Sequence, residues 1–263
     1  MADIPDCIRT GDDYVTDVAR QSMRQMNRRR HRSAVLPGPG SPLGFRSWAR
    51  ELVSLANATI RPPPYTAQEL PRGDGHGVLL VPGFLAGDWT MSRLRAFLVS
   101  LGYRVEQAGI VFNPGPTAGM IARLEAALLR LSAETGPVDL VGQSLGGVFA
   151  RELARRHARY VRSVVTLCTP IHFPVTTPLA PFALALAPFH DAKWLGRSGE
   201  LAMPLPVPVT AIYSRDDGIL DWRQCLQEET PGCRNVRVSG THSTVGSNPQ
   251  AQIAVAKALS DCA

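Results

Sequence analysis

The stretch of sequence that decides the fold is Val138-Asp139-Leu140-Val141-Gly142-Gln143-Ser144-Leu145-Gly146-Gly147-Val148. An apolar run ends at Gly142, a serine follows two residues later, and a second glycine comes two residues after the serine. A helical pattern begins directly after it. The sequence therefore has the pattern Gly-x-Ser-x-Gly between a strand and a helix, which is typical of a nucleophile elbow.

The spacing of this stretch has a steric reason. In so tight a turn, side chains at Gly142 and Gly146 would collide with neighbouring backbone. Ser144 is forced into a strained conformation that lifts its side chain clear of the sheet. Its Oγ would then lie at a helix N-terminus, which favours developing negative charge. The alternative interpretation is a glycine-rich turn whose hydroxyl has no chemical role.

Length and charge limit the possible classes of protein. A chain of 263 residues fits one large domain or two small ones and can bury a sizeable core. The formal net charge is +6, and residues 20–32 carry several arginines and no acid. Such a run can contact nucleic acid or an anionic membrane surface, but a solvated arm is the favoured interpretation. The arginines are Arg20, Arg24, Arg28, Arg29, Arg30 and Arg32.

The cysteines and the N-terminus indicate the compartment. The five cysteines are odd in number, and none has metal-ligand spacing with histidines. Cys225 and Cys233 are close enough for a local disulfide, which the sequence leaves open, whereas separate thiols favour a reducing compartment. The first residues lack the apolar core of a signal peptide, and no uninterrupted apolar run is long enough to span a bilayer. We expect a cytoplasmic protein.

Two regions of different character divide the chain. Residues 1–76 are expected to form an extension that contains the basic arm, an amphipathic helix over 45–59 and a proline-rich linker at 62–64. The apolar positions of that helix are Trp48, Leu52, Leu55 and Ala56. The main domain is expected over residues 77–263.

The main domain alternates strands with helices. Alternation of this kind predicts a parallel sheet covered on both faces, with reactive groups at the carboxyl ends of the strands. Asp88 is expected to cap the first helix. The predicted strands are 78–81, 103–106, 138–141, 161–167, 207–213 and 235–238, and the predicted helices are 88–100, 117–132, 145–157 and 249–259.

The alternation stops between Thr169 and Pro206. This segment is apolar but is interrupted by prolines, which disfavour a buried core element. We predict an inserted cap over the site, at about residues 170–206, with an apolar inner face. The prolines include Pro174, Pro178, Pro181 and Pro188.

An activated serine needs a base, and the base needs an orienting acid. In sheets of this type the acid and the base follow the serine in that order. The strand at 209–213 runs into Asp216, Asp217 and Asp221, and the strand at 236–238 runs into His242. Both loops are expected on the same edge of the sheet as the elbow.

With these motifs the sequence resembles the α/β-hydrolase superfamily, and it is most similar to its bacterial serine esterases and lipases. The resemblance covers residues 77–263 and implies an α/β-hydrolase fold. The motifs that carry it are Val-Pro-Gly-Phe at 81–84, Gly-Gln-Ser-Leu-Gly-Gly at 142–147, Thr-Leu-Cys-Thr-Pro at 166–170, Tyr-Ser-Arg-Asp-Asp-Gly-Ile-Leu at 213–220 and Gly-Thr-His-Ser at 240–243.

The resemblance also implies roles for individual residues. Ser144 is the nucleophile, His242 the base and Asp217 the acid, whereas Asp216 and Asp221 are the alternatives that fit a turn residue and a helix cap. His31, His76, His157, His172 and His190 lie at positions that match the base poorly.

The oxyanion hole needs two backbone N–H groups, and the resemblance places them on Phe84 and Leu145. Two positions depart from the family pattern: Gln143 replaces a frequent histidine, and Cys168 stands where glycine is frequent. The family's catalytic domain does not require the extension at residues 1–76. Nothing in the sequence asks for a metal or an organic cofactor.

These features predict a serine hydrolase that cleaves carboxylic esters with a lipophilic acyl group through an acyl-enzyme on Ser144. The alternatives are a thioesterase or acyltransferase with the same triad, and a non-catalytic α/β-hydrolase scaffold. The expected partner is a small lipophilic ester. The basic arm allows peripheral contact with an anionic membrane, nucleic acid is not favoured, and the oligomeric state is open.

Overall fold

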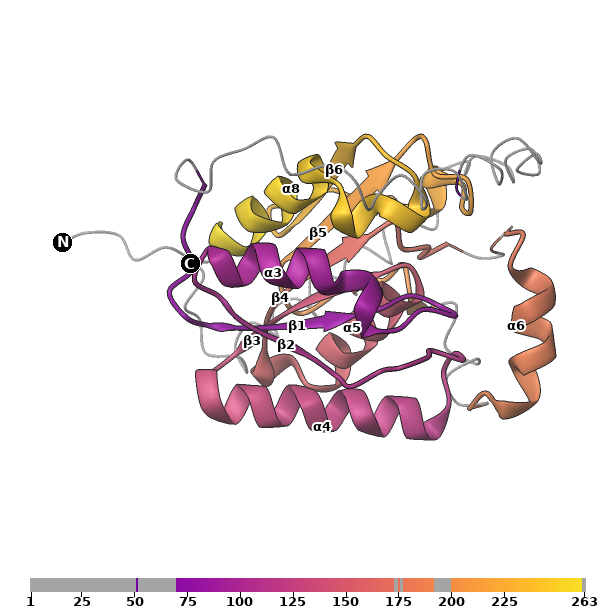
Figure 1. The fold of residues 1–263 in the computed structure, drawn as a ribbon, viewed down its shortest axis with the longest axis horizontal. Helices are drawn as coiled ribbons and strands as arrows, with labels where there is room; N and C mark the ends of the chain where they lie inside the picture. Colours follow the sequence, from indigo (N-terminus) through magenta and orange to yellow (C-terminus); the bar gives the residue numbers. More distant parts are fainter. Residues whose placement is uncertain (1–50, 52–69, 173–174, 176, 192–199, 262–263) are drawn as a thin grey trace, which may run out of the picture.

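The computed structural model describes residues 51, 70–172, 175, 177–191 and 200–261 (Figure 1). The predictions for the basic arm, for the proline-rich linker and for the helix over 45–59 lie outside the described residues, apart from Glu51. The prediction of a parallel sheet covered on both faces is confirmed. Six parallel strands have the order β2-β1-β3-β4-β5-β6.

The strands are close to their predicted positions. They are β1 (Gly77–Val81), β2 (Arg104–Gln107), β3 (Val138–Gln143), β4 (Val161–Leu167), β5 (Val209–Ser214) and β6 (Cys233–Val238). The helices are α3 (Ser92–Ser100), α4 (Ala118–Thr135), α5 (Leu145–Arg156), α6 (Ala180–Leu186) and α8 (Pro249–Ser260). Short 3-10 helices connect them: η3 (Asp88–Met91), η4 (Ala158–Tyr160), η5 (Ala187–Phe189), η7 (Trp222–Cys225) and η8 (His242–Ser247).

Each face of the sheet has its own apolar core. Successive side chains of a strand point to opposite faces, so Val78 and Leu80 pack with α3 and α8, whereas Leu79 and Val81 pack with α4 and α5. Figure 1 shows the two helix layers on either side of the sheet. A strand buried on both faces cannot alternate apolar with polar residues, which explains the wholly apolar run of β1.

The start of the first predicted helix differs from the prediction. Residues 88–91 form the 3-10 helix η3, and Gly87 rather than Asp88 is its N-cap. The Asp88 carboxylate instead accepts a hydrogen bond from the N–H of Ile110 at 2.9 Å. Asp88 therefore connects the loop after β1 to the loop after β2. Its carboxylate bonds an N–H group of the second loop and not an N–H group of its own helix.

The helix α6 was missed by the sequence analysis because of its prolines. Pro181 lies in its first turn, where the absent N–H costs no intrahelical hydrogen bond. In Figure 1 α6 stands apart from the sheet, on the side toward which β1 points.

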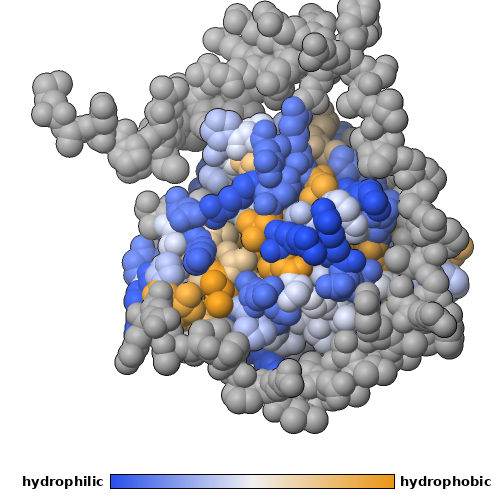
Figure 2. Space-filling view, turned by 90° about the horizontal axis from the view of Figure 1, so that it is seen from above, coloured by the Kyte–Doolittle hydropathy of each residue, from blue (hydrophilic) through white to orange (hydrophobic). Residues whose placement is uncertain are grey.

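The surface is mixed in character. Figure 2 views the molecule from the side of α8 and β6, where most of the described surface is hydrophilic and the hydrophobic patches are small. Within the described ranges, no helix is both long enough and apolar enough to cross a bilayer. Cys225 and Cys233, whose pairing the sequence left open, are both free thiols.

The turn between β3 and α5 brings three segments of the backbone into close contact: the end of β3, the start of α5 and the end of β1. A Cβ at Gly142 would lie 2.3 Å from the carbonyl oxygen of Gly146, and a Cβ at Gly146 would lie 2.1 Å from the carbonyl oxygen of Val81. Real Cβ atoms do not approach backbone so closely. Glycine at both positions therefore allows the start of α5 to pack directly on the end of β1.

A buried ion pair holds the opposite end of β3. Asp139 is fully buried, and its Oδ2 lies 2.6 Å from Nε2 of His76. Its Oδ1 accepts a hydrogen bond from the Ser163 hydroxyl on β4. Burial alone would lower the pKa of His76, but the carboxylates of Asp139 and, less strongly, Asp74 together outweigh burial and leave that pKa raised.

The pair predicts a pH-dependent loss of stability in His76→Ala. Removing one partner of a buried pair typically costs about 3–5 kcal/mol of unfolding free energy. Because the pKa of His76 is higher in the folded state, its protonated form stabilises the fold. This stabilisation is complete below the pKa of the unfolded chain, about 6.5, and it declines as the pH rises through the pKa of the folded state. The gap to wild type in urea denaturation should thus be larger at about pH 6 than at about pH 9.

The control for this prediction is Asp74→Ala, which removes the exposed carboxylate that also contacts His76. An exposed pair contributes about 0–1 kcal/mol, so this variant should stay close to wild type. Equal midpoints for His76→Ala and Asp74→Ala would contradict the assignment of the stabilisation to Asp139.

The elbow predicts that Gly146→Ala is poorly tolerated. Forcing a methyl group into a filled space typically costs about 1–3 kcal/mol, and here the neighbour is backbone that cannot rotate away. The matched control is Gly119→Ala on α4, where a Cβ would meet no atom within 4 Å. Urea midpoints should fall for Gly146→Ala and hold for Gly119→Ala, and similar midpoints for the two would rule out the steric account.

Candidate active site

Ser144 occupies the turn between β3 and α5 with strained backbone. Its φ is 53° and its ψ is −123°, and its N–H donates to the carbonyl oxygen of Leu167 on β4 at 2.8 Å. The side chain is half-buried. Leu145 is the first residue of α5, where helix N–H groups have no intrahelical acceptor.

The loop after β1 lies against this turn. A Cβ at Gly83 would be 3.2 Å from Cβ of Ser144. In the same loop the N–H of Leu85 donates to Asn113 O and the N–H of Ala86 donates to Gly83 O. Within the described part of the chain, the N–H of Phe84 has no such acceptor.

Strained backbone concentrates at this edge of the sheet. Among the described residues, three non-glycine residues have positive φ: Leu85 at 59°, Ser144 at 53° and Cys168 at 46°. They follow β1, β3 and β4, which are neighbours in the sheet. Such strain persists only where the surroundings enforce it, and it gathers at functional sites. The positive φ of Cys168 also explains why glycine suits that position.

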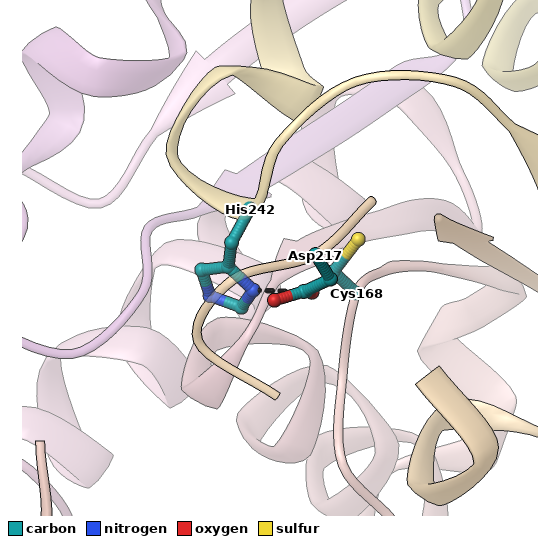
Figure 3. A group of neighbouring side chains, drawn as sticks. All are labelled: Cys168, Asp217 and His242. Atoms are coloured by element: carbon teal, nitrogen blue, oxygen red, sulfur yellow. Dashed lines mark hydrogen bonds and ion pairs between the residues drawn. The ribbon is translucent and has the colours of Figure 1, made fainter. Parts of the chain in front are cut away.

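Asp217 and His242 meet across the loops that follow β5 and β6. The Oδ2 of Asp217 lies 2.7 Å from Nδ1 of His242, and both side chains are buried (Figure 3). The Oδ1 of Asp217 accepts the N–H groups of Ile219 and Leu220, each at 2.8 Å. The carboxylate is thus fixed by its own loop and directed at the imidazole.

The two alternative acids lie elsewhere. Asp216 is exposed in a turn. Asp221 is the N-cap of η7 and accepts the N–H of Arg223 at 3.0 Å. Both positions agree with the turn and cap expected for them, and neither carboxylate is bonded to His242 among the described contacts.

The other described histidines make structural contacts. His157 Nε2 lies 3.3 Å from a carboxylate oxygen of Glu125, His172 Nε2 lies 2.8 Å from Leu226 O, and His190 Nε2 lies 2.9 Å from Pro114 O. His76 pairs with Asp139, and His31 lies outside the described residues.

The charge of Asp217 governs the imidazole beside it. Burial favours the neutral form of His242, but the carboxylate of Asp217 and, less strongly, that of Glu51 outweigh burial and raise the pKa of His242. Burial and the Asp217 charge also raise the pKa of the Cys168 thiol, which is therefore neutral. The site thus holds a basic imidazole next to an uncharged thiol (Figure 3).

Cys168, Asp217 and His242 are the group of described residues whose ligand atoms lie close enough for a metal, within 4.8 Å of one another. Their hydrogen bonds do not fit an ion, however. Asp217 Oδ2 faces Nδ1 of His242, and Asp217 Oδ1 accepts two backbone N–H groups of its own loop. The arrangement is that of an acid–base pair.

Two contacts around His242 were not foreseen from the sequence. Gln143, directly before Ser144, donates from Nε2 to the carbonyl oxygen of His242 at 2.9 Å. Glu51 accepts the N–H groups of Gly218, His242 and Ser243. One signal was present for Glu51: it interrupts the apolar face of Trp48, Leu52 and Leu55 at helical spacing.

Several solved structures of lipolytic enzymes have the same fold as this chain. A structure from the metagenome-derived lipolytic enzymes LipS and LipT has a TM-score of 0.58 at 16% identity, over 73% of this chain and 95% of that chain. The metagenomic carboxyl esterase MGS0156 has a TM-score of 0.56 at 15% identity, over 86% and 96%. The monoacylglycerol lipase of Paleococcus ferrophilus has a TM-score of 0.53 at 15% identity, over 74% and 97%.

These identities establish a shared fold and no more. A comparison with curated protein sequences found no match. The model of the alpha/beta hydrolase family, in contrast, matches residues 78–254, which include the six strands apart from Gly77 of β1, the elbow and both loops of the Asp217–His242 pair. The chain is a member of the alpha/beta hydrolase family.

Proposed function

We propose that the protein is a serine hydrolase that cleaves carboxylic esters through an acyl-enzyme on Ser144. The observation that carries this proposal is the bond between Asp217 and His242, in loops at the sheet edge where Ser144 also stands. Three chain segments far apart in sequence supply a nucleophile, a base and an orienting acid there.

The reaction follows from these roles. Nε2 of His242 takes the proton of the Ser144 hydroxyl as Oγ attacks the ester carbonyl carbon. The tetrahedral intermediate collapses, the bond to the alcohol oxygen breaks, and His242 returns the proton to the leaving alcohol. Water then attacks the acyl-enzyme with the same base and releases the acid. Asp217 holds the imidazole with Nδ1–H toward itself and stabilises the imidazolium.

The oxyanion of the intermediate would be held by the N–H groups of Phe84 and Leu145. Two observations support this assignment of the oxyanion hole. Leu145 begins α5, and the N–H of Phe84 has no acceptor in the described part of the chain. The close approach of Gly83 to Ser144 brings the Phe84 loop beside the nucleophile. Donors fixed before the reaction stabilise developing charge without reorganising.

We also propose that residues 170–206 cap the catalytic domain, which spans residues 77–263. Leu179, before α6, packs against Ile219 and Leu220 in the loop after β5. Beyond η5, the N–H of Asp191 donates to Pro116 O in the loop that leads to α4. The described residues 177–191 of this segment thus contact the loop after β5 at one end and the loop after β2 at the other.

The cap carries the argument for a lipophilic substrate. Phe182 and Leu184 of α6 are 56% and 74% exposed, and large exposed apolar side chains that gather in one region can mark a ligand-binding surface. Val111 and Phe112, in the loop joined to the cap, are exposed as well. We infer that this apolar surface receives the acyl chain of the ester.

The proposed function predicts the effect of Ser144→Ala. Hydrolysis of p-nitrophenyl acetate, butyrate, octanoate and dodecanoate should fall by about three orders of magnitude or more, because no nucleophile remains. In wild type, kcat/KM should be higher for octanoate than for acetate. The control is Ser100→Ala, an exposed serine that bonds only within α3, and it should match wild type.

Equal turnover by wild type and Ser144→Ala would exclude the proposal. Transfer of the acyl group to an added alcohol in preference to water, or turnover of acyl-CoA esters alone, would replace it with an acyltransferase or a thioesterase. A folded wild type that hydrolyses none of these esters would leave a non-catalytic scaffold.

The proposed function also predicts the pH dependence of kcat/KM. His242 must be neutral to accept the serine proton, so activity rises as pH passes through its pKa. Since that pKa is raised, the midpoint of the acid limb should lie above about 6.5. Asp217→Asn should move the midpoint to lower pH and lower kcat by about 10³–10⁴-fold. An acid limb at the same pH in both proteins would contradict the pairing.

A further inference from the structure

Glu51 connects the two loops that carry the acid and the base. Its Oε1 accepts the N–H of Gly218 and the N–H of His242, each at 2.8 Å, and its Oε2 accepts the N–H of Ser243 at 2.9 Å. The residue is only 3% exposed. A buried carboxylate is costly unless its oxygens are bonded, and these three bonds meet that requirement.

The position of Glu51 in the sequence makes this contact notable. It lies in the N-terminal extension, 167 residues before Gly218 and 191 residues before His242. The alpha/beta hydrolase match begins only at residue 78. A residue outside the matched region therefore reaches the backbone of the catalytic loops.

We propose that Glu51 is a positioning residue of the hydrolase, which fixes the Asp217 loop and the His242 loop in one geometry. The proposal rests on the function proposed for Ser144, Asp217 and His242. It makes Glu51, a residue that precedes the family match, part of the working active site.

The geometry shows how the carboxylate acts. Gly218 directly follows Asp217, so the bond to its N–H fixes the peptide unit that leaves the acid. The bonds to the N–H groups of His242 and Ser243 fix the peptide units on either side of the base. The backbones of both loops are thus bonded to the same Glu51 carboxylate. These backbone bonds hold Asp217 and His242 in the positions from which their side chains make the 2.7 Å contact.

Other contacts tie these loops at different points. The Ser214 hydroxyl donates to Gly240 O at 2.5 Å, and Gln143 donates to His242 O at 2.9 Å. Neither acts on the peptide that follows Asp217. Among the described residues, Glu51 is the side chain that bonds both the peptide after the acid and the peptide of the base.

Glu51 also contributes charge. The groups facing His242 are Asp217 from the loop after β5, Glu51 from the extension and the neutral thiol of Cys168 after β4. The negative charge of Glu51 adds to that of Asp217 in raising the pKa of His242. Loss of this charge lowers that pKa, whereas a merely structural role would leave it unchanged.

The test compares Glu51→Gln, Glu51→Asp and a matched control. In Glu51→Gln, we expect kcat to fall by about ten- to a hundredfold with KM nearly unchanged, because reacting groups are misplaced while the ester site is intact. The acid limb of the pH profile should move to lower pH. Glu51→Asp keeps the charge but not the reach, so kcat should fall while the acid limb stays near that of wild type.

The control is Asp139→Asn, which alters a buried carboxylate at the other end of β3. It should lower stability while leaving kcat and the acid limb as in wild type. The proposal is overturned if Glu51→Gln, with its urea midpoint lowered or not, keeps the kcat and the acid limb of wild type.

A second measurement does not depend on hydrolysis. In the Ser144→Ala background, NMR titration of the His242 imidazole should give a lower pKa when Glu51→Gln is added and the same pKa when Asp139→Asn is added. An unchanged pKa on adding Glu51→Gln would refute the role of Glu51 even if the wild type proved to hydrolyse no ester. An inactive wild type with the expected pKa shift would refute the proposed function instead.

Discussion

The close contact between the start of α5 and the end of β1 is the constraint on which the site depends. A side chain at Gly146 would overlap the carbonyl oxygen of Val81, and one at Gly142 would overlap Gly146 itself. With those spaces empty, the chain reverses between strand and helix so tightly that Ser144 takes a φ of 53°. The hydroxyl and the first N–H groups of α5 then stand at one edge of the sheet.

The strain of this edge is balanced by the rigid structure around it. Leu85, Ser144 and Cys168 all have positive φ, and each follows a strand buried in the two apolar cores. At the far end of β3, Asp139 ties the sheet to His76 and Ser163. These contacts stabilise the far end of the sheet, whereas the Asp217–His242 pair lies in the loops at the edge where the strained residues stand.

The sequence was sufficient for the parallel sheet, because the sheet rests on local signals, whereas the triad of Ser144, Asp217 and His242 stays a proposal. Apolar runs such as β1 and the Gly-x-Ser-x-Gly turn are read within a few residues. The sequence was insufficient where contacts between distant residues determine the structure. Asp88 bonds Ile110 instead of capping a helix, α6 forms despite its prolines, and Glu51 finds its partners more than 160 residues away. The interruption of an apolar face by Glu51 was the one local sign.

The central claim is that Ser144 carries the acyl group, and labelling with a fluorophosphonate tests it most directly. Intact-mass and peptide mass spectrometry should find one covalent adduct, on the peptide containing Ser144, formed by the native protein and absent after denaturation or in Ser144→Ala. A native protein that stays unlabelled, or one that is labelled at another residue, would contradict the account.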